Sequence, residues 1–122
     1  MRAIDADELI ETCKGQLATL EVWAKESPET SKAFFDFAGA LGKYGGLDPK
    51  TFQLVYIGMQ VCKGNVASVC GHTAFAKAAG ATREEIIGVI TTSMMEVGIN
   101  GVCDCLVPAL EAYDNAPCPE EK

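Results

Sequence analysis

Amphipathic segments that begin at capping residues and end at glycines constrain this fold more than any other sequence feature. Apolar residues recur every three or four positions, which is the helical period, and no stretch shows the strict alternation of a strand. The start signals are Asp5 with Glu8, Ser27–Pro28, Asp48–Pro49, Asn65, and Thr82 with Glu85. The expected helices cover about 5–25, 28–44, 49–64, 65–79, 82–97 and 102–113. The sequence therefore predicts an all-α single domain over 1–122, with about six helices and a frayed tail at 115–122.

Charge and hydrophobicity exclude several classes of protein. The net charge is −7 and no run of Lys or Arg is present, which argues against binding to nucleic acid. A hydrophobic content of 48% is too high for a disordered chain. No apolar run is long enough to span a membrane, and the acidic start does not resemble a signal peptide. We therefore expect a cytoplasmic protein without a membrane partner.

The apolar residues also suggest how the chain assembles. A chain of 122 residues buries only about two-thirds of its unfolded surface, so apolar helix faces remain to be covered. We expect Trp23 and the phenylalanines of 34–37 to lie in the core, and Met59 to lie in the core or in a contact between subunits. The sequence thus favours a homo-oligomer.

The stretch 62–85 holds the residues best suited to chemistry. It contains His72, the only histidine, and two of the six cysteines, Cys62 and Cys70. A helix is expected to begin at Asn65, and the positive end of a helix lowers the pKa of a nearby thiol. Redox chemistry by cysteine is therefore one hypothesis for this stretch.

The same part of the chain resembles a known family. Leu47-Asp48-Pro49-Lys50 opens one helix, His72-Thr73-Ala74 continues a second, and Ala79-Gly80-Ala81-Thr82-Arg83-Glu84-Glu85-Ile86 follows. Across 47–87 this pattern is similar to the carboxymuconolactone decarboxylase/alkylhydroperoxidase D family. The resemblance implies a small helical domain that assembles as a homo-trimer or homo-hexamer. It also implies either reduction of hydroperoxides by a Cys-x-x-Cys pair with a glutamate and a histidine, or decarboxylation of a ring lactone.

The chain departs from the redox pattern of that family. When the pattern is anchored on His72, the two cysteines would fall at 65 and 68 and the glutamate at 53. This sequence has Asn65, Ser68 and Gln53 there. Glutamine forms hydrogen bonds but does not take up a proton at neutral pH. The ordinary peroxidase mechanism therefore cannot operate unchanged.

Two redox arrangements of the remaining thiols stay open. In the first, Cys62 and Cys70 replace the lost pair, although Cys70 and His72 lie on nearly opposite sides of a helix. In the second, Cys103 and Cys105 carry the redox work, alone or with Cys62. A Cys-x-Cys pair on a regular helix faces opposite ways, so a direct disulfide there would need non-helical backbone.

Two other interpretations of the thiols also remain. Cys62, Cys70, Cys103 and Cys105, with His72, could hold zinc or an iron–sulfur cluster, but their spacing does not match a known knuckle. Alternatively, the thiols are buried structural residues without chemistry. We expect no cofactor.

A polar group offers a non-redox alternative. Ser68 and His72 share a helix face with Asn65 nearby, and a hydrogen-bonded pair is favoured there over a serine nucleophile. On the preceding helix, Gln53 and Tyr56 fall on one stripe, which in the family's arrangement borders the pocket beside His72.

Three functional hypotheses follow. The first is a thiol-dependent oxidoreductase of the alkylhydroperoxidase D type with an antioxidant role. In it Cys70 or Cys62 attacks, the other or Cys103/Cys105 resolves, and His72 polarises the pocket, with a thiol reductant protein as partner. The second is a decarboxylase-type lyase that acts on a small carboxylate in the pocket of His72, Ser68, Gln53 and Tyr56. The third is an oligomeric module that binds a small ligand without catalysis.

Overall fold

The computed structural model describes residues 18–119, and every regular element in that range is a helix. The chain is helical over 18–26. The helices that follow are α2 (Pro28–Tyr44), α3 (Pro49–Lys63), α4 (Val66–Ala78), α5 (Arg83–Thr92), α6 (Met94–Val97) and α7 (Ile99–Asn115). The all-α prediction is confirmed. The expected start at Asp5 and Glu8, residue Cys13 and the last residues of the tail lie outside the described residues.

The predicted capping residues begin the helices that surround the candidate site. Asp48 accepts from the backbone N of Thr51 at 3.0 Å and Asn65 accepts from that of Ser68 at 3.1 Å. Thr82 and Glu85 form the predicted capping box. Gly64 ends α3 at φ 72°, a left-handed conformation that favours glycine. These local signals place the starts of α3, α4 and α5 within a residue of the prediction.

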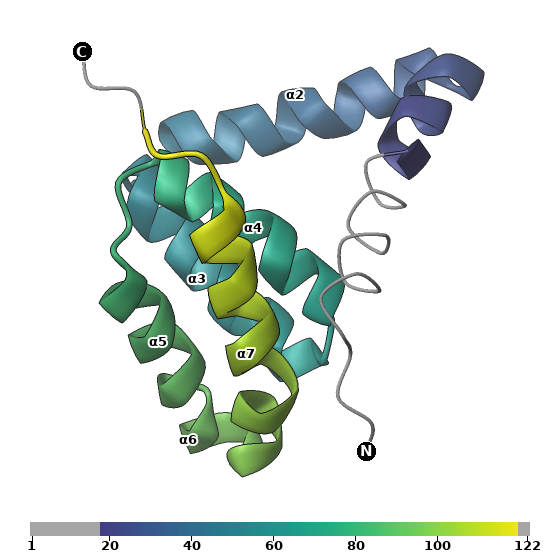
Figure 1. The fold of residues 1–122 in the computed structure, drawn as a ribbon. Coiled ribbons are helices and arrows are strands. Elements are labelled where there is room, and N and C mark those ends of the chain that lie inside the picture. The colour runs from purple at the N-terminus through teal and green to yellow at the C-terminus, as the bar shows by residue number, and fades with distance from the viewer. Residues whose placement is uncertain (1–17, 120–122) are drawn as a thin grey trace.

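Helices α3, α4, α5 and α7 pack together into a bundle (Figure 1). Its fully buried side chains include Ile57 on α3, Val69 and Cys70 on α4, Ile86 and Ile90 on α5, and Cys105 on α7. These apolar side chains hold α3 against α4 and thereby fix the relative position of the two helices that carry the polar candidate residues. None of the described helices combines the length and apolar character that a bilayer span requires.

Helix α2 does not join this bundle. It runs across one end of the bundle and extends beyond it (Figure 1), and it makes no substantial contact with α3–α7. Phe34 is 49% exposed and Phe37 is 62% exposed, so the prediction that the phenylalanines of 34–37 lie in the core is wrong for the single chain. Trp23 is half-buried, with its ring centroid 5.4 Å from that of Phe34. Helical periodicity identified an apolar face here, but α3–α7 do not cover it.

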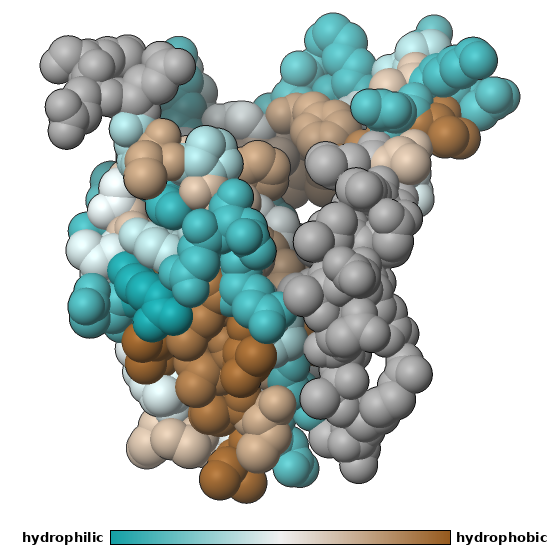
Figure 2. Space-filling view, viewed as in Figure 1, coloured by the Kyte–Doolittle hydropathy of each residue, from teal (hydrophilic) through white to brown (hydrophobic). Residues whose placement is uncertain are grey.

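Two boundaries near the end of the bundle also differ from the prediction. The segment expected as one helix over 82–97 divides at Ser93, whose hydroxyl donates to the carbonyl of Ile90 at 2.5 Å. Gly98, at φ 69° and ψ −165°, then turns the chain so that α7 begins at Ile99 instead of about 102. Helix α7 continues through Pro108. Figure 2 shows apolar surface over the lower part of α7 and the adjoining α5–α6 side, and Val107 is 63% exposed.

A stability prediction follows from Gly101, which lies where α7, α6 and α3 meet. A Cβ at this position would lie 2.9 Å from Val97 Cγ2, 3.0 Å from Val61 Cγ1 and 3.1 Å from Ser93 Oγ. Gly101→Ala should therefore lower the free energy of unfolding by about 1–3 kcal/mol. Urea denaturation checks this, with Gly71→Ala as the control because a Cβ at Gly71 meets nothing within 4 Å. Equal unfolding midpoints for the two variants would contradict the packing argument.

Candidate functional site

A polar cluster lies between α3 and α4. The Nδ1 atom of His72 and the Oε1 atom of Gln53 are 2.8 Å apart. The ring centroids of Tyr56 and His72 are 4.0 Å apart, with 36° between the ring planes. The structure thus brings together His72 and the two α3 residues that were expected to border it. All three side chains are half-buried.

The hydrogen bond to Gln53 sets the chemical state of the imidazole. An amide oxygen can only accept, so Nδ1 carries the proton and donates it to Gln53 Oε1. The second nitrogen, Nε2, then holds the lone pair. Burial lowers the pKa of His72 below its ordinary value of 6.5, because an apolar environment disfavours the charged form. The ring is therefore neutral at pH 7, with Nε2 as its basic atom.

Phe75 was missed as a neighbour of His72. Its ring lies edge-on to the imidazole, with centroids 5.5 Å apart, and it is 54% exposed. A signal was present in the sequence, because residues three apart on a helix share a face. Phe75 adds an apolar edge to the cluster.

The other polar candidates begin α4. Asn65 is exposed and caps the helix, while Ser68 is 8% exposed. Ser68 lies one helical turn before His72, as the spacing requires. These two residues build the start of the helix that carries His72.

The thiols fall into two groups. Cys70 is 1% exposed and Cys105 is fully buried, whereas Cys62 and Cys103 are exposed. Burial, with a smaller contribution from Asp104, raises the pKa of Cys105 to about 11. Cys105 is thus a poor source of thiolate, while solvent reaches Cys62 and Cys103 directly.

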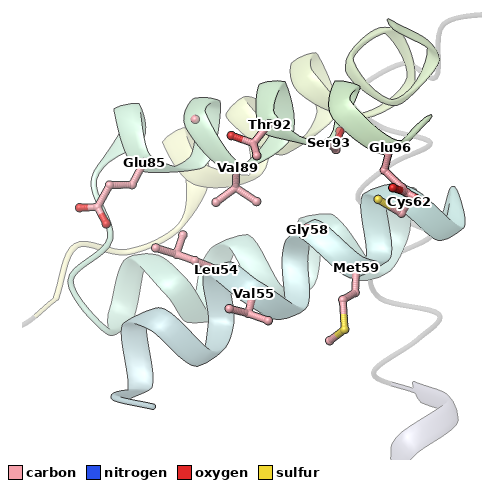
Figure 3. A pocket seen from close by; sticks show the side chains of 11 residues that line it. Leu54, Val55, Gly58, Met59, Cys62, Glu85, Val89, Thr92, Ser93 and Glu96 are labelled. Carbon is pink, nitrogen blue, oxygen red and sulfur yellow. The ribbon is translucent and has the colours of Figure 1, made fainter. Parts of the chain in front are cut away.

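An open apolar groove runs between α3 and α5, with a volume of about 780 Å³. Leu54, Val55, Met59 and Cys62 line it on α3, and Val89 and Thr92 line it on α5. In Figure 3 Leu54 lies toward Val89, whereas Val55 and Met59 extend from α3 away from α5. The other residues that line the groove are Gly58, Glu85, Gly88, Ser93 and Glu96. None of the three residues of the His72 cluster lines this groove. The structure therefore separates Cys62 from the polar cluster, on a different side of α3.

The described residues form no preformed metal site of the kind that the metal hypothesis requires. Within 18–119, no group of three or more His, Cys, Asp or Glu side chains is arranged to hold a metal ion. Cys62 and Cys103 are exposed while Cys70 and Cys105 are buried, so the four thiols named for this hypothesis do not share one environment. Within residues 18–119, His72 contacts Gln53, Tyr56 and Phe75, so the cluster offers one imidazole nitrogen and no carboxylate.

Comparison with known proteins places this geometry in a family. The carboxymuconolactone decarboxylase family profile matches residues 28–106, which include α2 to α6, the start of α7, and the whole His72 cluster. No curated protein and no solved structure gives a significant match. The matched region exceeds half of the chain and has the helical architecture that the sequence resemblance implied. The chain therefore belongs to the carboxymuconolactone decarboxylase family.

Proposed function

We propose that this protein is a small-molecule lyase of the decarboxylase type, in which His72 carries a proton to or from the substrate. The observation that carries the proposal is the 2.8 Å contact between His72 Nδ1 and Gln53 Oε1. This hydrogen bond fixes the ring orientation and leaves Nε2 for the substrate. Positioned imidazoles are the groups most often used for acid–base catalysis.

The surroundings of His72 suit both of its protonation states. The neutral ring is favoured by burial, which lowers the pKa. When Nε2 takes up a proton, Nδ1 still donates to Gln53, and the positive ring lies against the face of Tyr56, 4.0 Å between centroids. An imidazolium with a lowered pKa is also a stronger acid than imidazolium in water. His72 is therefore suited to hold a proton briefly and to give it up.

The proposed reaction is the loss of CO₂ from a small carboxylate. The bond between the carboxyl carbon and its neighbour breaks, CO₂ leaves, and the electron pair stays on the substrate in conjugation with a carbonyl group. His72 is neutral at rest, so its Nε2 first takes up a proton from solvent. The imidazolium then gives this proton to the carbon that lost the carboxyl group and becomes neutral again. Solvent supplies the next proton to Nε2. Because the protein carries a net charge of −7, affinity for a carboxylate must come from short-range contacts near His72 rather than from long-range attraction.

The exposure of Cys62 favours a second candidate function, thiol-dependent reduction of hydroperoxides. The Cys62 thiolate would attack one peroxide oxygen to form a sulfenic acid and release an alcohol. A second thiol, with Cys103 as the exposed candidate, would form a disulfide and release water. A thiol reductant would then return the two electrons. Cys70 and Cys105 are less suited to the attack because both are buried.

The test compares three full-length proteins: the natural chain, His72→Gln, and Cys62→Ser/Cys103→Ser. Each is assayed for CO₂ release from a panel of small keto and lactone carboxylates, and for hydroperoxide consumption with dithiothreitol. We expect CO₂ release that falls by about 10²–10⁴-fold in His72→Gln and is unchanged in the double cysteine variant.

The opposite pattern would assign the second function. Peroxide consumption that disappears in Cys62→Ser/Cys103→Ser and persists in His72→Gln would replace the lyase proposal. If the natural chain shows neither CO₂ release nor peroxide consumption, both proposed functions are contradicted. Binding of a small ligand without catalysis is then the remaining hypothesis. Circular dichroism of all three proteins controls for loss of fold.

A further inference from the structure

Two buried polar side chains beside the His72 cluster have no hydrogen-bond partner in the described part of the chain. Gln60 on α3 and Ser68 on α4 are each only 8% exposed. Neither the side-chain amide of Gln60 nor the hydroxyl of Ser68 forms a hydrogen bond with any of residues 18–119. Buried amides and hydroxyls without partners lower stability, and native proteins satisfy nearly all of them. These two groups therefore need a partner that the described fold does not supply.

Asn65 holds Gln60 and Ser68 at one corner, where α3 ends and α4 begins. Its backbone N–H donates to the carbonyl of Gln60 at 3.0 Å, and its Oδ1 atom accepts from the backbone N–H of Ser68 at 3.1 Å. Within 18–119, every side-chain nitrogen and oxygen that is sealed from solvent has a hydrogen-bond partner. The unpartnered amide of Gln60 and hydroxyl of Ser68 therefore still touch solvent, and a small ligand can replace that solvent.

This corner borders the same site as the imidazole of His72. Gln53, Tyr56 and Gln60 are three and four residues apart, so they follow one face of α3. Ser68 precedes His72 by four residues on one face of α4, which is a rise of about 6 Å. The contact between Gln53 and His72 shows that these two faces meet. The corner and the imidazole therefore lie about one helical turn apart along a common seam.

The groups at the corner favour an anionic ligand. The Gln60 amide has two N–H donors and the Ser68 hydroxyl has one O–H donor. Ser68 lies in the first turn of α4, at the positive end of that helix. Lys63 follows Gln60 by three residues, is exposed, and has no ion-pair partner within 18–119. Donors beside positive charge suit the two oxygens of a carboxylate.

We propose that Gln60 and Ser68 bind a carboxylate group of the substrate on which His72 acts, a subsite that rests on the lyase function proposed above. One carboxylate oxygen accepts from the Gln60 amide and the other from the Ser68 hydroxyl. The bound carboxylate is one that the substrate keeps, because the carbon that loses CO₂ must reach His72 Nε2, about one helical turn away. The substrate therefore carries a second carboxylate about 6 Å from the carbon that is protonated.

An NMR titration of the full chain with glutarate tests this binding, with the uncharged diamide glutaramide as the control ligand. Glutarate should shift the side-chain NH₂ signals of Gln60, which Gln60→Leu identifies, and glutaramide should leave them in place. Ser68→Ala and Gln60→Leu should each weaken glutarate binding by about tenfold or more, because each removes a hydrogen bond to a charged group. Thr73→Val should bind glutarate unchanged, since the buried Thr73 hydroxyl already donates to the carbonyl of Val69 at 2.7 Å.

The melting temperatures of the same variants separate a ligand site from a structural role. Ser68→Ala and Gln60→Leu remove no hydrogen bond within the described chain, so both should melt at or above the temperature of the natural chain. Lower melting temperatures with unchanged affinity for glutarate would give Gln60 and Ser68 a structural role and overturn the proposal. A Gln60 signal that glutarate does not shift, or that glutaramide shifts equally, would show that the corner holds only water.

The subsite and the lyase function fail in different ways. A natural chain that binds glutarate through Gln60 and Ser68 but releases no CO₂ from any substrate keeps the subsite and loses the lyase function. CO₂ release with the same KM in Ser68→Ala, Gln60→Leu and the natural chain keeps the lyase function and overturns the subsite. A higher KM in both variants, with a smaller change in kcat, supports the two together.

Discussion

Gln53→Glu is expected to raise the pKa of His72 above its ordinary value of 6.5, from the lowered value that burial gives it in the natural chain. The new carboxylate would lie where Gln53 Oε1 now lies, 2.8 Å from His72 Nδ1. A negative charge at hydrogen-bond distance favours the imidazolium, and such contacts change proton affinity by about 10- to 1,000-fold. The substitution also restores the residue type that the redox branch of the family carries at this position.

Proton NMR measures this directly, because the chain has a single histidine and the folded protein gives one imidazole titration. Gln53→Leu is the matched control. It removes the hydrogen bond without adding charge, so the pKa of His72 should stay below 6.5 because burial persists. A Gln53→Glu titration that coincides with that of the natural chain would show that the two side chains do not meet in solution.

The same substitution should reverse the contribution of His72 to stability as a function of pH. In the natural chain the folded-state pKa of His72 is lowered, so its unfolded state binds the proton more readily. The contribution of His72 to the free energy of unfolding is complete above pH 6.5 and is lost as the pH falls through the folded-state pKa. In Gln53→Glu the folded-state pKa is raised, so the stabilisation is present below 6.5 and is lost as the pH rises through that pKa. The free energy of unfolding, measured by urea denaturation between pH 5 and 8, should therefore change with pH in opposite directions in the two proteins.

Local signals in the sequence were sufficient for much of the fold. Asp48, Asn65 and Thr82 begin their helices as predicted because a cap depends only on residues within the next turn. The break at Ser93 was not predictable in this way. The hydrogen bond from Ser93 to the carbonyl of Ile90 is local, but the burial of Ser93 beside Gly101 of α7 is a tertiary contact.

In the candidate site, too, local spacing could be predicted from the sequence and tertiary packing could not. The stripe of Gln53 and Tyr56 followed from helical spacing, and its position beside His72 followed from the resemblance. The structure shows both contacts. Spacing could not show that Cys70 is buried and Cys62 exposed, because burial depends on which helices pack on each face. Nor could the apolar pattern around Phe37 show whether its own chain or another chain covers that face.

A second large effect is expected from Lys77, a lysine on α4 that is only 9% exposed. Its Nζ donates to the carbonyls of Tyr113 and Ala116, each at 2.8 Å, and lies 4.6 Å from the ring centroid of Tyr113. The last carbonyls of a helix have no partners within the helix and form its negative end. Lys77 therefore satisfies the end of α7 and joins it to α4, the helix that carries His72.

Lys77→Met should lower the free energy of unfolding by about 2–4 kcal/mol, since hydrogen bonds to a charged group contribute about 1.5–3 kcal/mol each. Methionine keeps the apolar stem but offers the two carbonyls no donor. The melting temperature should fall by roughly 10–20 °C at fixed protein concentration, measured by calorimetry. Lys63→Met is the control, because Lys63 is exposed and its loss should change stability by less than about 0.5 kcal/mol. If Lys77→Met and Lys63→Met have the same melting temperature, water replaces the ammonium group at the end of α7 without loss of stability. The contact between α7 and the helix that carries His72 then depends on apolar packing alone.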